Sequence, residues 1–411
     1  MKLVMSRCDV TPKEPVYLAG YIQRKTRFEG VHDPITATVM VFTIKGEKIV
    51  WSTADLGGGS NAVIDEVIKR VNANGIALDR NHFVFGGTHT HSGPVVNDSF
   101  TREQIGEPEK NYFEFLCDSL TKVICECWNK DGEEVHAKYS NIIIDGLYSN
   151  RNDKNKLSDK NEYMLGFFNN DDQLVGVYHL MSHHCTVIGP QSMMVSADLF
   201  GALRSRLEKH FGCLFLMAQG NAGDMGNRQY RNGNDFAAVE REANDLMEQI
   251  VNKYSWKDID IDNFEHKSVV YHAKYHVDYG KYKDKYEEYK SRLAVETDFD
   301  MIKQLTGWVK MAERKKDLPS KDIEVDMPAE IITMNQLQIA LVPGELGSIL
   351  GLRIKEASKA KLAFVWGYVN GCDLGYMIEK EAFSTESQES QVTNYNPGVC
   401  EEYIETIINN L

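Results

Sequence analysis

The chain has 411 residues, of which 42% are hydrophobic and 26% are charged, and its formal net charge at pH 7 is −14. This length and composition indicate one large globular domain or two modest ones. The acidic balance disfavours nucleic acid or an anionic membrane surface as a partner. No window of about 18 apolar residues is present, and residues 1–12 lack the apolar core of a signal peptide. We therefore expect a cytoplasmic protein without stable membrane insertion.

The first third of the chain alternates between extended and helical patterns. Apolar residues recur at helical spacing in residues 61–74 and 103–129, which predicts two amphipathic helices. Strands are predicted where apolar runs lie between charged or glycine-rich joints, at residues 16–21, 36–44, 48–52, 83–85 and 137–144.

The remainder of the chain begins with a polar segment, 151–163, that is expected to form a loop. Ser196 is a favourable N-cap for a helix that extends to His210. Residues 384–397 are irregular. Strands are predicted at residues 173–181, 214–217, 330–342 and 362–369, and helices at 235–254 and up to Leu411.

Residues 279–317 differ in composition, because Lys, Glu and Tyr alternate there. This pattern predicts a helical hairpin on the outside of the domain, and we favour a solvated helical face over a partner-binding arm. No repeat or low-complexity linker divides the chain. The expected fold is therefore a single α/β (mixed α+β) domain over residues 1–411, with layered β-sheets flanked by helices and a helical-hairpin insertion. Eight scattered cysteines without a repeated Cys-x-x-Cys pair argue against a zinc ribbon.

The most informative stretch is Phe83-Val-Phe-Gly-Gly-Thr-His-Thr-His-Ser-Gly-Pro94. Its apolar start predicts a strand, and its Ser-Gly-Pro end predicts a turn. On an extended chain, His89 and His91 point to the same face. Such a pair can supply one metal ligand and one catalytic or supporting group. The alternative is a hydrogen-bonded pair that caps the strand.

Three further segments run from a predicted strand into a turn that carries a polar group. In Met181-Ser-His-His-Cys-Thr-Val187, His183 and His184 point opposite ways on an extended chain, so only one can face a shared site. Glu345 can ligate zinc or interact with a helix dipole. Tyr376 is by default a buried tyrosine. Two histidines and a carboxylate are a recurring catalytic zinc set.

The loop Gly220-Asn-Ala-Gly-Asp224 has two interpretations. Its backbone N–H groups could line an anion or oxyanion pocket, or the loop could be only a tight connection. Its glycine spacing is not that of a dinucleotide-binding motif.

These landmarks, in this order along nearly the whole chain, resemble the catalytic domain of the neutral (non-lysosomal) ceramidases and their bacterial homologues. The most specific motif is Thr88-His-Thr-His-Ser-Gly-Pro94. The other matching segments are Asp9-Val-Thr-Pro12, Gly30-Val-His-Asp-Pro34, Asn150-Arg151, His184-Cys-Thr186 (where the family has His-Pro-Thr), Ser196-Ala-Asp198, Ala222-Gly-Asp224, Pro343-Gly-Glu345 and residues 370–376.

The resemblance implies a role for each of six residues. The family's zinc is held by two His, one Glu and one Tyr, which correspond here to His89, His184, Glu345 and Tyr376. By the same correspondence, His91 polarises the substrate or handles a proton, and Arg151 helps to bind the carbonyl oxygen. The implied activity is that of a zinc-dependent amidase, in the family an enzyme of lipid metabolism, which cleaves an N-acyl bond with metal-activated water.

The sequence differs from the family at several points. Gly226 stands where the ceramidases carry a catalytically important serine, and Gln388 stands where a tyrosine is expected. The chain also stops where they continue into an immunoglobulin-like domain. We therefore expect a small-molecule acyl amide or ester as substrate rather than long-chain ceramide. The alternatives are a catalytically degenerate metal-binding protein and a hydrolase of a different ester or sugar-derived substrate, and a homo-oligomer is left open.

Overall fold

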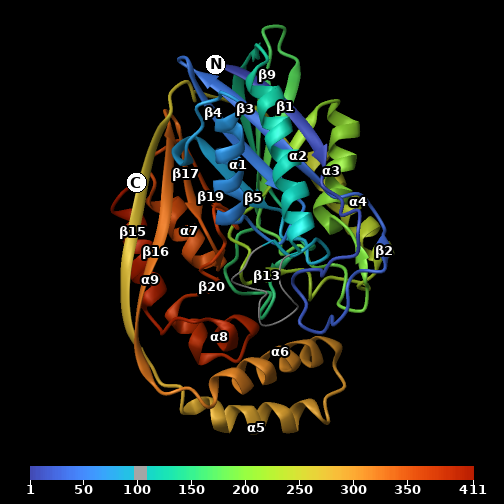
Figure 1. Cartoon of the computed structure of the whole chain (residues 1–411), viewed down its shortest axis with the longest axis vertical. Coiled ribbons are helices and arrows are strands. Elements are labelled where there is room, and N and C mark those ends of the chain that lie inside the picture. Colours follow the sequence, from blue (N-terminus) through green and yellow to red (C-terminus); the bar gives the residue numbers. More distant parts are fainter. Residues whose placement is uncertain (97–108) are drawn as a thin grey trace.

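The computed structural model describes residues 1–96 and 109–411, and the described strands form three larger sheets (Figure 1). The first sheet has the order β5 (Phe83–Gly87), β4 (Glu47–Ala54), β3 (Thr36–Ile44), β1 (Lys2–Asp9) and β6 (Glu133–Glu134). The second has the order β12 (Leu214–Gln219), β10 (Leu174–Met181), β9 (Asn161–Phe168), β7 (His136–Ile143) and β14 (Lys257–Ile259). The third has the order β15 (Glu265–Val277), β16 (Lys321–Met334), β17 (Leu337–Val342) and β19 (Leu362–Gly367).

Short strand pairs and helices complete the described part of the chain. The pairs are β2 (Gly30–Val31) with β11 (Met194–Val195), β8 (Ser149–Asn150) with β13 (Met225–Gly226), and β18 (Glu345–Leu346) with β20 (Tyr376–Met377). The helices are α1 (Asn61–Ala73), α2 (Lys110–Trp128), α3 (Asp198–Phe211), α4 (Phe236–Lys253), α5 (Lys281–Leu293), α6 (Phe299–Lys315), α7 (Ser348–Ala357), α8 (Gln388–Val392) and α9 (Val399–Ile408), with 3-10 turns at Arg80–His82 and Lys380–Ser384.

The three larger sheets share one apolar core. Trp51 of β4, Tyr178 of β10 and Trp366 of β19 meet there, with ring centroids 5.1 to 5.8 Å apart. Edge-on contacts between aromatic rings at this spacing are favourable beyond the area that they bury. One residue from each sheet therefore ties the three sheets together, and the predicted single layered α/β domain is confirmed.

The outer face of each larger sheet is covered by a pair of helices (Figure 1). Helices α1 and α2 pack on the first sheet, α3 and α4 on the second, and α7 and α9 on the third. The residues that α1 buries are Val63, Ile64, Val67 and Val71, which share one helical face. Within the described ranges, no helix is long and apolar enough to span a membrane.

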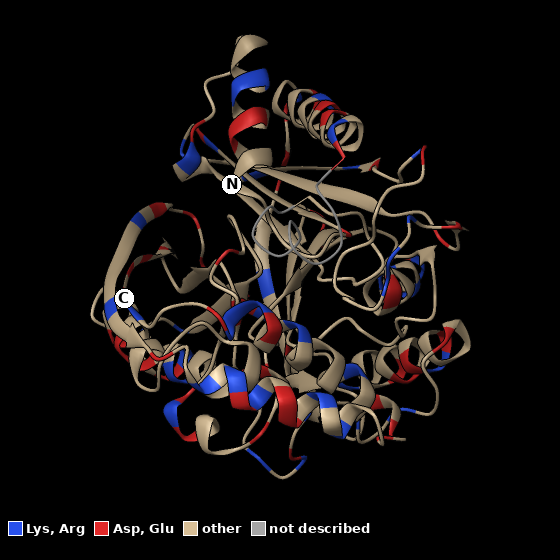
Figure 2. Ribbon diagram, turned by 60° about the horizontal axis from the view of Figure 1, so that its bottom comes forward, with Lys and Arg blue, Asp and Glu red and all other residues tan. Residues whose placement is uncertain are grey.

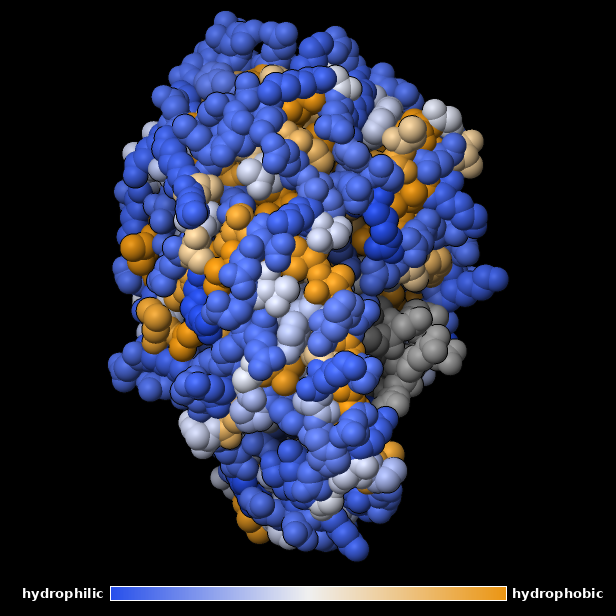
Figure 3. Space-filling view, turned by 90° about the vertical axis from the view of Figure 1, so that its left-hand side faces the viewer, coloured by the Kyte–Doolittle hydropathy of each residue, from blue (hydrophilic) through white to orange (hydrophobic). Residues whose placement is uncertain are grey.

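The predicted hairpin is formed by α5 and α6, which β15 and β16 carry away from the core of the sheets (Figure 1). It has its own apolar cluster around Trp308 and Tyr289. Charged residues of both signs lie along it (Figure 2). The molecule narrows toward this end, with hydrophobic residues scattered among hydrophilic ones (Figure 3). Because Trp308 Nε1 donates a 3.0 Å hydrogen bond to Gln388 Oε1, α6 is joined to α8 and through it to the body of the protein.

Each larger sheet contributes one parallel strand pair. The pairs are β4 with β5, β10 with β12, and β17 with β19. Loops that follow the carboxyl ends of parallel strands are a common place for ligand sites. The segments that carry His89, His184, Glu345 and Tyr376 follow β5, β10, β17 and β19, respectively.

Several predicted strands are wrong or incomplete. Residues 16–21 form no strand beyond a single bridge between Leu18 and Pro94. The predicted loop 151–163 ends where β9 begins at Asn161, and the sequence pattern does not predict β1 or β15. The pattern fails for β1 and β15 because most of their side chains are only partly buried or exposed, so charged and apolar residues mix along them.

The predicted N-cap of α3 is also wrong by one residue. The N-cap is Ala197, and the Ser196 hydroxyl accepts a hydrogen bond of 2.9 Å from the Asp198 N–H while it donates to Asp33. Ser196 therefore stabilises the start of α3 although it lies one residue before the N-cap.

Other helices agree with the prediction where they can be compared. Helix α4 begins after its N-cap Asp235, within the predicted range 235–254. The predicted helix 103–129 is described from Lys110 onward as α2, and its residues 103–108 lie outside the described ranges.

Candidate metal centre and active site

The six residues that the sequence singles out line one cavity of about 710 Å³. Each of the strands β5, β8, β10, β17 and β19 leads into a segment that supplies at least one of them. The fold therefore gathers side chains from distant parts of the sequence around a common space. The six are His89, His91, Arg151, His184, Glu345 and Tyr376.

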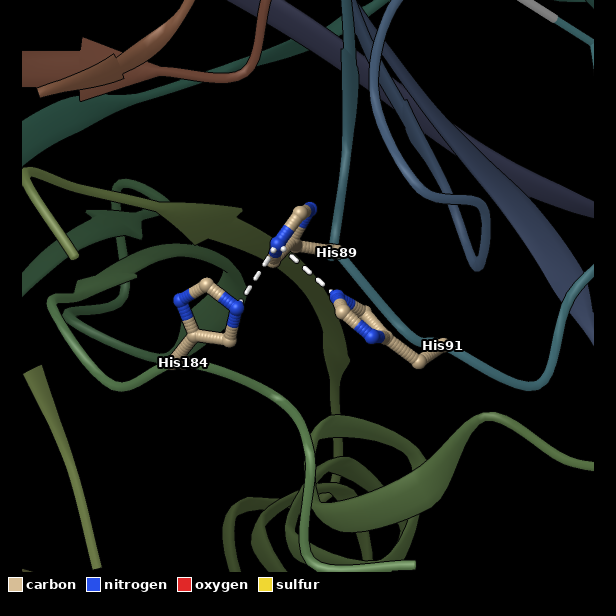
Figure 4. A group of neighbouring side chains, drawn as sticks. All are labelled: His89, His91 and His184. Atoms are coloured by element: carbon tan, nitrogen blue, oxygen red, sulfur yellow. Dashed lines mark hydrogen bonds between the residues drawn. The ribbon is translucent and has the colours of Figure 1, made fainter. Parts of the chain in front are cut away.

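The two histidines of the central motif lie on a turn rather than on a strand. Strand β5 ends at Gly87, and His89 has a left-handed φ of +65°, so the predicted extended spacing does not hold. The turn nevertheless brings the rings together, with 3.2 Å between His91 Nε2 and His89 Nε2 (Figure 4). Gly20 makes room for this arrangement, because a Cβ there would lie 2.2 Å from His91 Cγ. The two rings therefore face the same region, as predicted, but they do so because of the turn and not because side chains alternate along a strand.

His184 completes the histidine cluster from the segment after β10. Its Nε2 lies 3.1 Å from His89 Nε2, and the two rings meet edge to face (Figure 4). The neighbouring His183 points away, and its ring packs against Tyr148 with the centroids 4.6 Å apart. Burial lowers the pKa of His183 to about 3. As the sequence predicts, one member of the pair faces the site.

Glu345 and Tyr376 are register neighbours in the short parallel pair of β18 and β20. Glu345 Oε2 lies 3.3 Å from His89 Nε2 and 4.0 Å from His184 Nε2. This oxygen is buried and has no hydrogen-bond partner in the described part of the chain. Burial and the charge of Glu345 raise the pKa of Tyr376, whereas the charge of Arg151 lowers it.

The hydrogen bonds behind the histidine rings test whether this cluster fits a metal ion. His89 Nδ1 lies 2.5 Å from the Gly57 carbonyl oxygen, and His184 Nδ1 lies 3.1 Å from that of Ala222. A carbonyl oxygen only accepts hydrogen bonds, so both rings carry their hydrogen on Nδ1 and present an Nε2 lone pair to the cavity. The two Nε2 atoms lie 3.1 Å apart beside the carboxylate of Glu345, and a cation between them would be coordinated by both lone pairs. The donor set therefore fits a divalent metal such as zinc.

His91 belongs to the same cluster but differs from the other two histidines. His89, His91 and His184 form a group able to hold a metal ion, with ligand atoms within 4.8 Å of one another. His91 Nδ1, however, is buried without a hydrogen-bond partner. Burial, together with the charges of His89 and Lys303, lowers the pKa of His91 well below 6.5. This imidazole is therefore neutral at pH 7.

Arg151 is fixed by a carboxylate that the sequence pattern does not predict. Its Nε lies 2.5 Å from Glu389 Oε1 on α8, and its Nη2 donates a hydrogen bond of 3.2 Å to the Tyr376 hydroxyl. Glu389 also accepts a hydrogen bond of 2.8 Å from Asn152. Burial alone would lower the pKa of Arg151, but the interactions with Glu389 and Tyr376 outweigh the effect of burial and raise this pKa. No sequence signal marks Glu389, because it lies in a segment without clear periodicity.

The loop 220–224 is a tight connection that supports the site. The N–H groups of Gly220, Ala222 and Gly223 donate to protein carbonyls, so they are not free to bind an anion. Gly223 packs against the backbone of Glu345, where a Cβ would lie 2.4 Å from the Glu345 carbonyl oxygen. The loop therefore orients a ligand-bearing segment and does not form an oxyanion pocket.

The chain is similar to known proteins in sequence and in fold. Neutral ceramidases from Drosophila melanogaster and Drosophila pseudoobscura pseudoobscura are each 25% identical to this chain over 228 residues, which are 51% of this chain and 32% of the relative. The match thus spans about a third of the length of these relatives. The crystal structure of neutral ceramidase from Pseudomonas aeruginosa superposes with a TM-score of 0.76 at 18% identity, covering 99% of this chain and 73% of that one. A ceramidase complexed with C2 gives a TM-score of 0.74 at 16% identity, covering 99% and 74%. No family model matches the chain.

The shared fold is that of the neutral ceramidase structures, and in this chain it holds a buried cluster suited to a metal ion. The sequence matches make the relationship more specific. The chain is related to the neutral ceramidases, and the resemblance seen in the sequence is confirmed.

Proposed function

We propose that this protein is a zinc-dependent hydrolase that cleaves the amide bond of a small N-acyl compound, or the corresponding ester. The observation that carries the proposal is the convergence of two histidine Nε2 atoms and the unpartnered Glu345 Oε2 within one cavity. His89, His184, Glu345 and Tyr376 are the proposed ligands. A zinc ion held by them would supply a Lewis acid that activates water at neutral pH.

In this proposal, Arg151 binds the carbonyl oxygen of the substrate. Its guanidinium lines the cavity and is held in place by Glu389. As water adds to the carbonyl carbon, negative charge develops on the carbonyl oxygen, and a fixed cation stabilises that charge without reorganising. Arg151 therefore lowers the barrier to forming the tetrahedral intermediate.

His91 is the proposed proton carrier. A neutral imidazole accepts a proton from the attacking water and then donates it to the leaving nitrogen as the carbon–nitrogen bond breaks. Because burial keeps the pKa of His91 low, its protonated form gives up the proton readily. In this proposal, Arg151 binds the carbonyl oxygen and His91 carries the proton within the same cavity.

Activity assays with and without metal test this proposal. Purified protein is offered a panel of N-acyl amides and esters of increasing chain length, after zinc loading and after treatment with EDTA. We expect hydrolysis that is lost with EDTA and restored by zinc. Zinc binding without hydrolysis of any compound in the panel would favour a metal-binding protein that has lost catalysis.

A further inference from the structure

The wall of the cavity that faces away from the sheets carries an excess of positive charge. Helix α6 contributes Lys303, and the segment after β13 contributes Arg228. Both side chains line the same cavity as Arg151 and the histidines. This concentration of cations stands out in a chain whose net charge is −14.

The protein supplies too few anions for these cations. Arg228 Nε and Lys303 Nζ each lie 3.9 Å from a carboxylate oxygen of Asp300, and neither head group makes a hydrogen bond within the described residues. The same carboxylate already accepts a hydrogen bond from Arg231. Three cations therefore share Asp300, while Glu389 is engaged by Arg151.

Burial and mutual repulsion both disfavour the charged forms of these side chains. Burial and the charges of Arg228, Arg231 and Arg151 lower the pKa of Lys303 to about 8, against the attraction of Asp300. Burial, followed by the charge of Arg151, lowers the pKa of Arg228. Partly buried cations that repel one another are stabilised when a ligand brings a negative charge between them.

We propose that Arg228 and Lys303 bind a carboxylate on the substrate, so that the preferred substrates are acyl amides that carry an acid group, such as N-acyl amino acids. A carboxylate has two oxygens and can be shared by one guanidinium and one ammonium. Apolar residues in the same cavity wall, Met311, Leu318 and Val392, provide a surface for a short acyl chain. This inference rests on the proposed hydrolase function and names its substrate class.

A matched pair of compounds tests the charge preference. N-octanoylglycine carries the carboxylate, and N-octanoylglycinamide is its uncharged counterpart of nearly the same shape. We expect kcat/KM for release of octanoate to be at least tenfold higher for the acid. Arg228→Met and Lys303→Met should bring the ratio of acid to amide toward one, whereas Lys283→Met, which removes an exposed cation of α5 outside the cavity, should leave the ratio unchanged.

Direct binding separates failure of this inference from failure of the proposed function. The dissociation constants of the same two compounds are measured by calorimetry on the zinc-loaded protein, which needs no turnover. Tighter binding of the acid that disappears in the Arg228 and Lys303 variants supports the inference even if neither compound is hydrolysed. Equal dissociation constants, or a preference that survives in both variants, would overturn the inference while leaving a hydrolase of neutral amides intact.

Discussion

Arg151 and Glu389, 238 positions apart in the chain, form a buried ion pair beside the proposed zinc ligand Tyr376. The exposed fractions of the two side chains are 10% and 1%, so neither charge is satisfied by bulk water. The pair connects the short helix α8 to the cavity. The position of Arg151 therefore depends on a residue that lies far away in sequence.

Replacement of Glu389 by Gln tests this dependence. The substitution keeps the shape but removes the charge that holds Arg151, so we expect kcat/KM to fall by about 10- to 100-fold. Removal of one partner of a buried ion pair also costs about 3–5 kcal/mol of unfolding free energy. Steady-state kinetics and urea denaturation measure the two effects. Glu386→Gln, which removes a more exposed carboxylate paired with Arg292, serves as the control and should change both quantities little.

The same pair predicts a dependence of stability on pH. Burial alone would raise the pKa of Glu389, but the charge of Arg151 lowers it below its ordinary value of 4.5. A carboxyl group whose pKa is depressed by folding contributes stability above its unfolded pKa, and loses it as the pH falls through the folded value. We therefore expect the unfolding free energy to drop more steeply below pH 4.5 in the wild type than in Glu389→Gln. Denaturation in EDTA at pH 5 and at lower pH checks this, and parallel curves would contradict it.

Replacement of His89 by Ala tests the metal site. Elemental analysis of the wild type should show about one zinc per chain, as expected for a single mononuclear site. His89→Ala removes the nitrogen that lies closest to both His184 and Glu345, so most of the metal should be lost. His82→Ala is the matched control, because His82 lies outside the cavity and pairs with Asp79. Full zinc occupancy in the His89 variant would show that the ligand assignment is wrong.

Replacement of His91 by Ala separates proton transfer from metal binding. If His91 carries the proton, the variant should keep its zinc and lose at least about 100-fold in kcat, within the usual range for a general acid–base group. Zinc content and kcat are measured on the same preparation. Loss of zinc together with activity would instead make His91 a ligand, as the short distances among the three histidines allow.

The sequence marks the residues that line the cavity more clearly than it marks the strands around them. His89, His184 and Glu345 each lie next to a short apolar strand and a turn, and these local patterns can be recognised without knowledge of the tertiary structure. By contrast, β15 is not predicted, although exposed residues alternate with less exposed ones from Ser268 to Val277, and its place in the sheet depends on its pairing with β16. Hydrogen bonds between strands distant in sequence are not encoded in either strand alone.

For a related reason, the sequence does not predict that Lys303 and Glu389 lie near the cavity. Lys303 lies in a segment whose composition is that of a solvated hairpin, and only the packing of α6 against α8 turns it toward the cavity. Glu389 likewise has no neighbours in sequence that suggest burial. Both residues acquire their importance from tertiary contacts and not from a local pattern.

The last prediction concerns ceramide itself. Gly226, which stands where the resemblance implies a serine, lies against Arg151: an added Cβ would come within 3.3 Å of Arg151 Cβ, and no hydroxyl is present at this position. Ceramide is also uncharged, and it would leave the excess charge of Arg228 and Lys303 uncompensated. We therefore expect long-chain ceramide to be a poor substrate compared with short N-acyl amides presented in the same detergent micelles. The measurement is kcat/KM for both, in the wild type and in Gly226→Ser. A preference of the wild type for ceramide of more than about tenfold, or some 1.4 kcal/mol in transition-state binding, would rule this out.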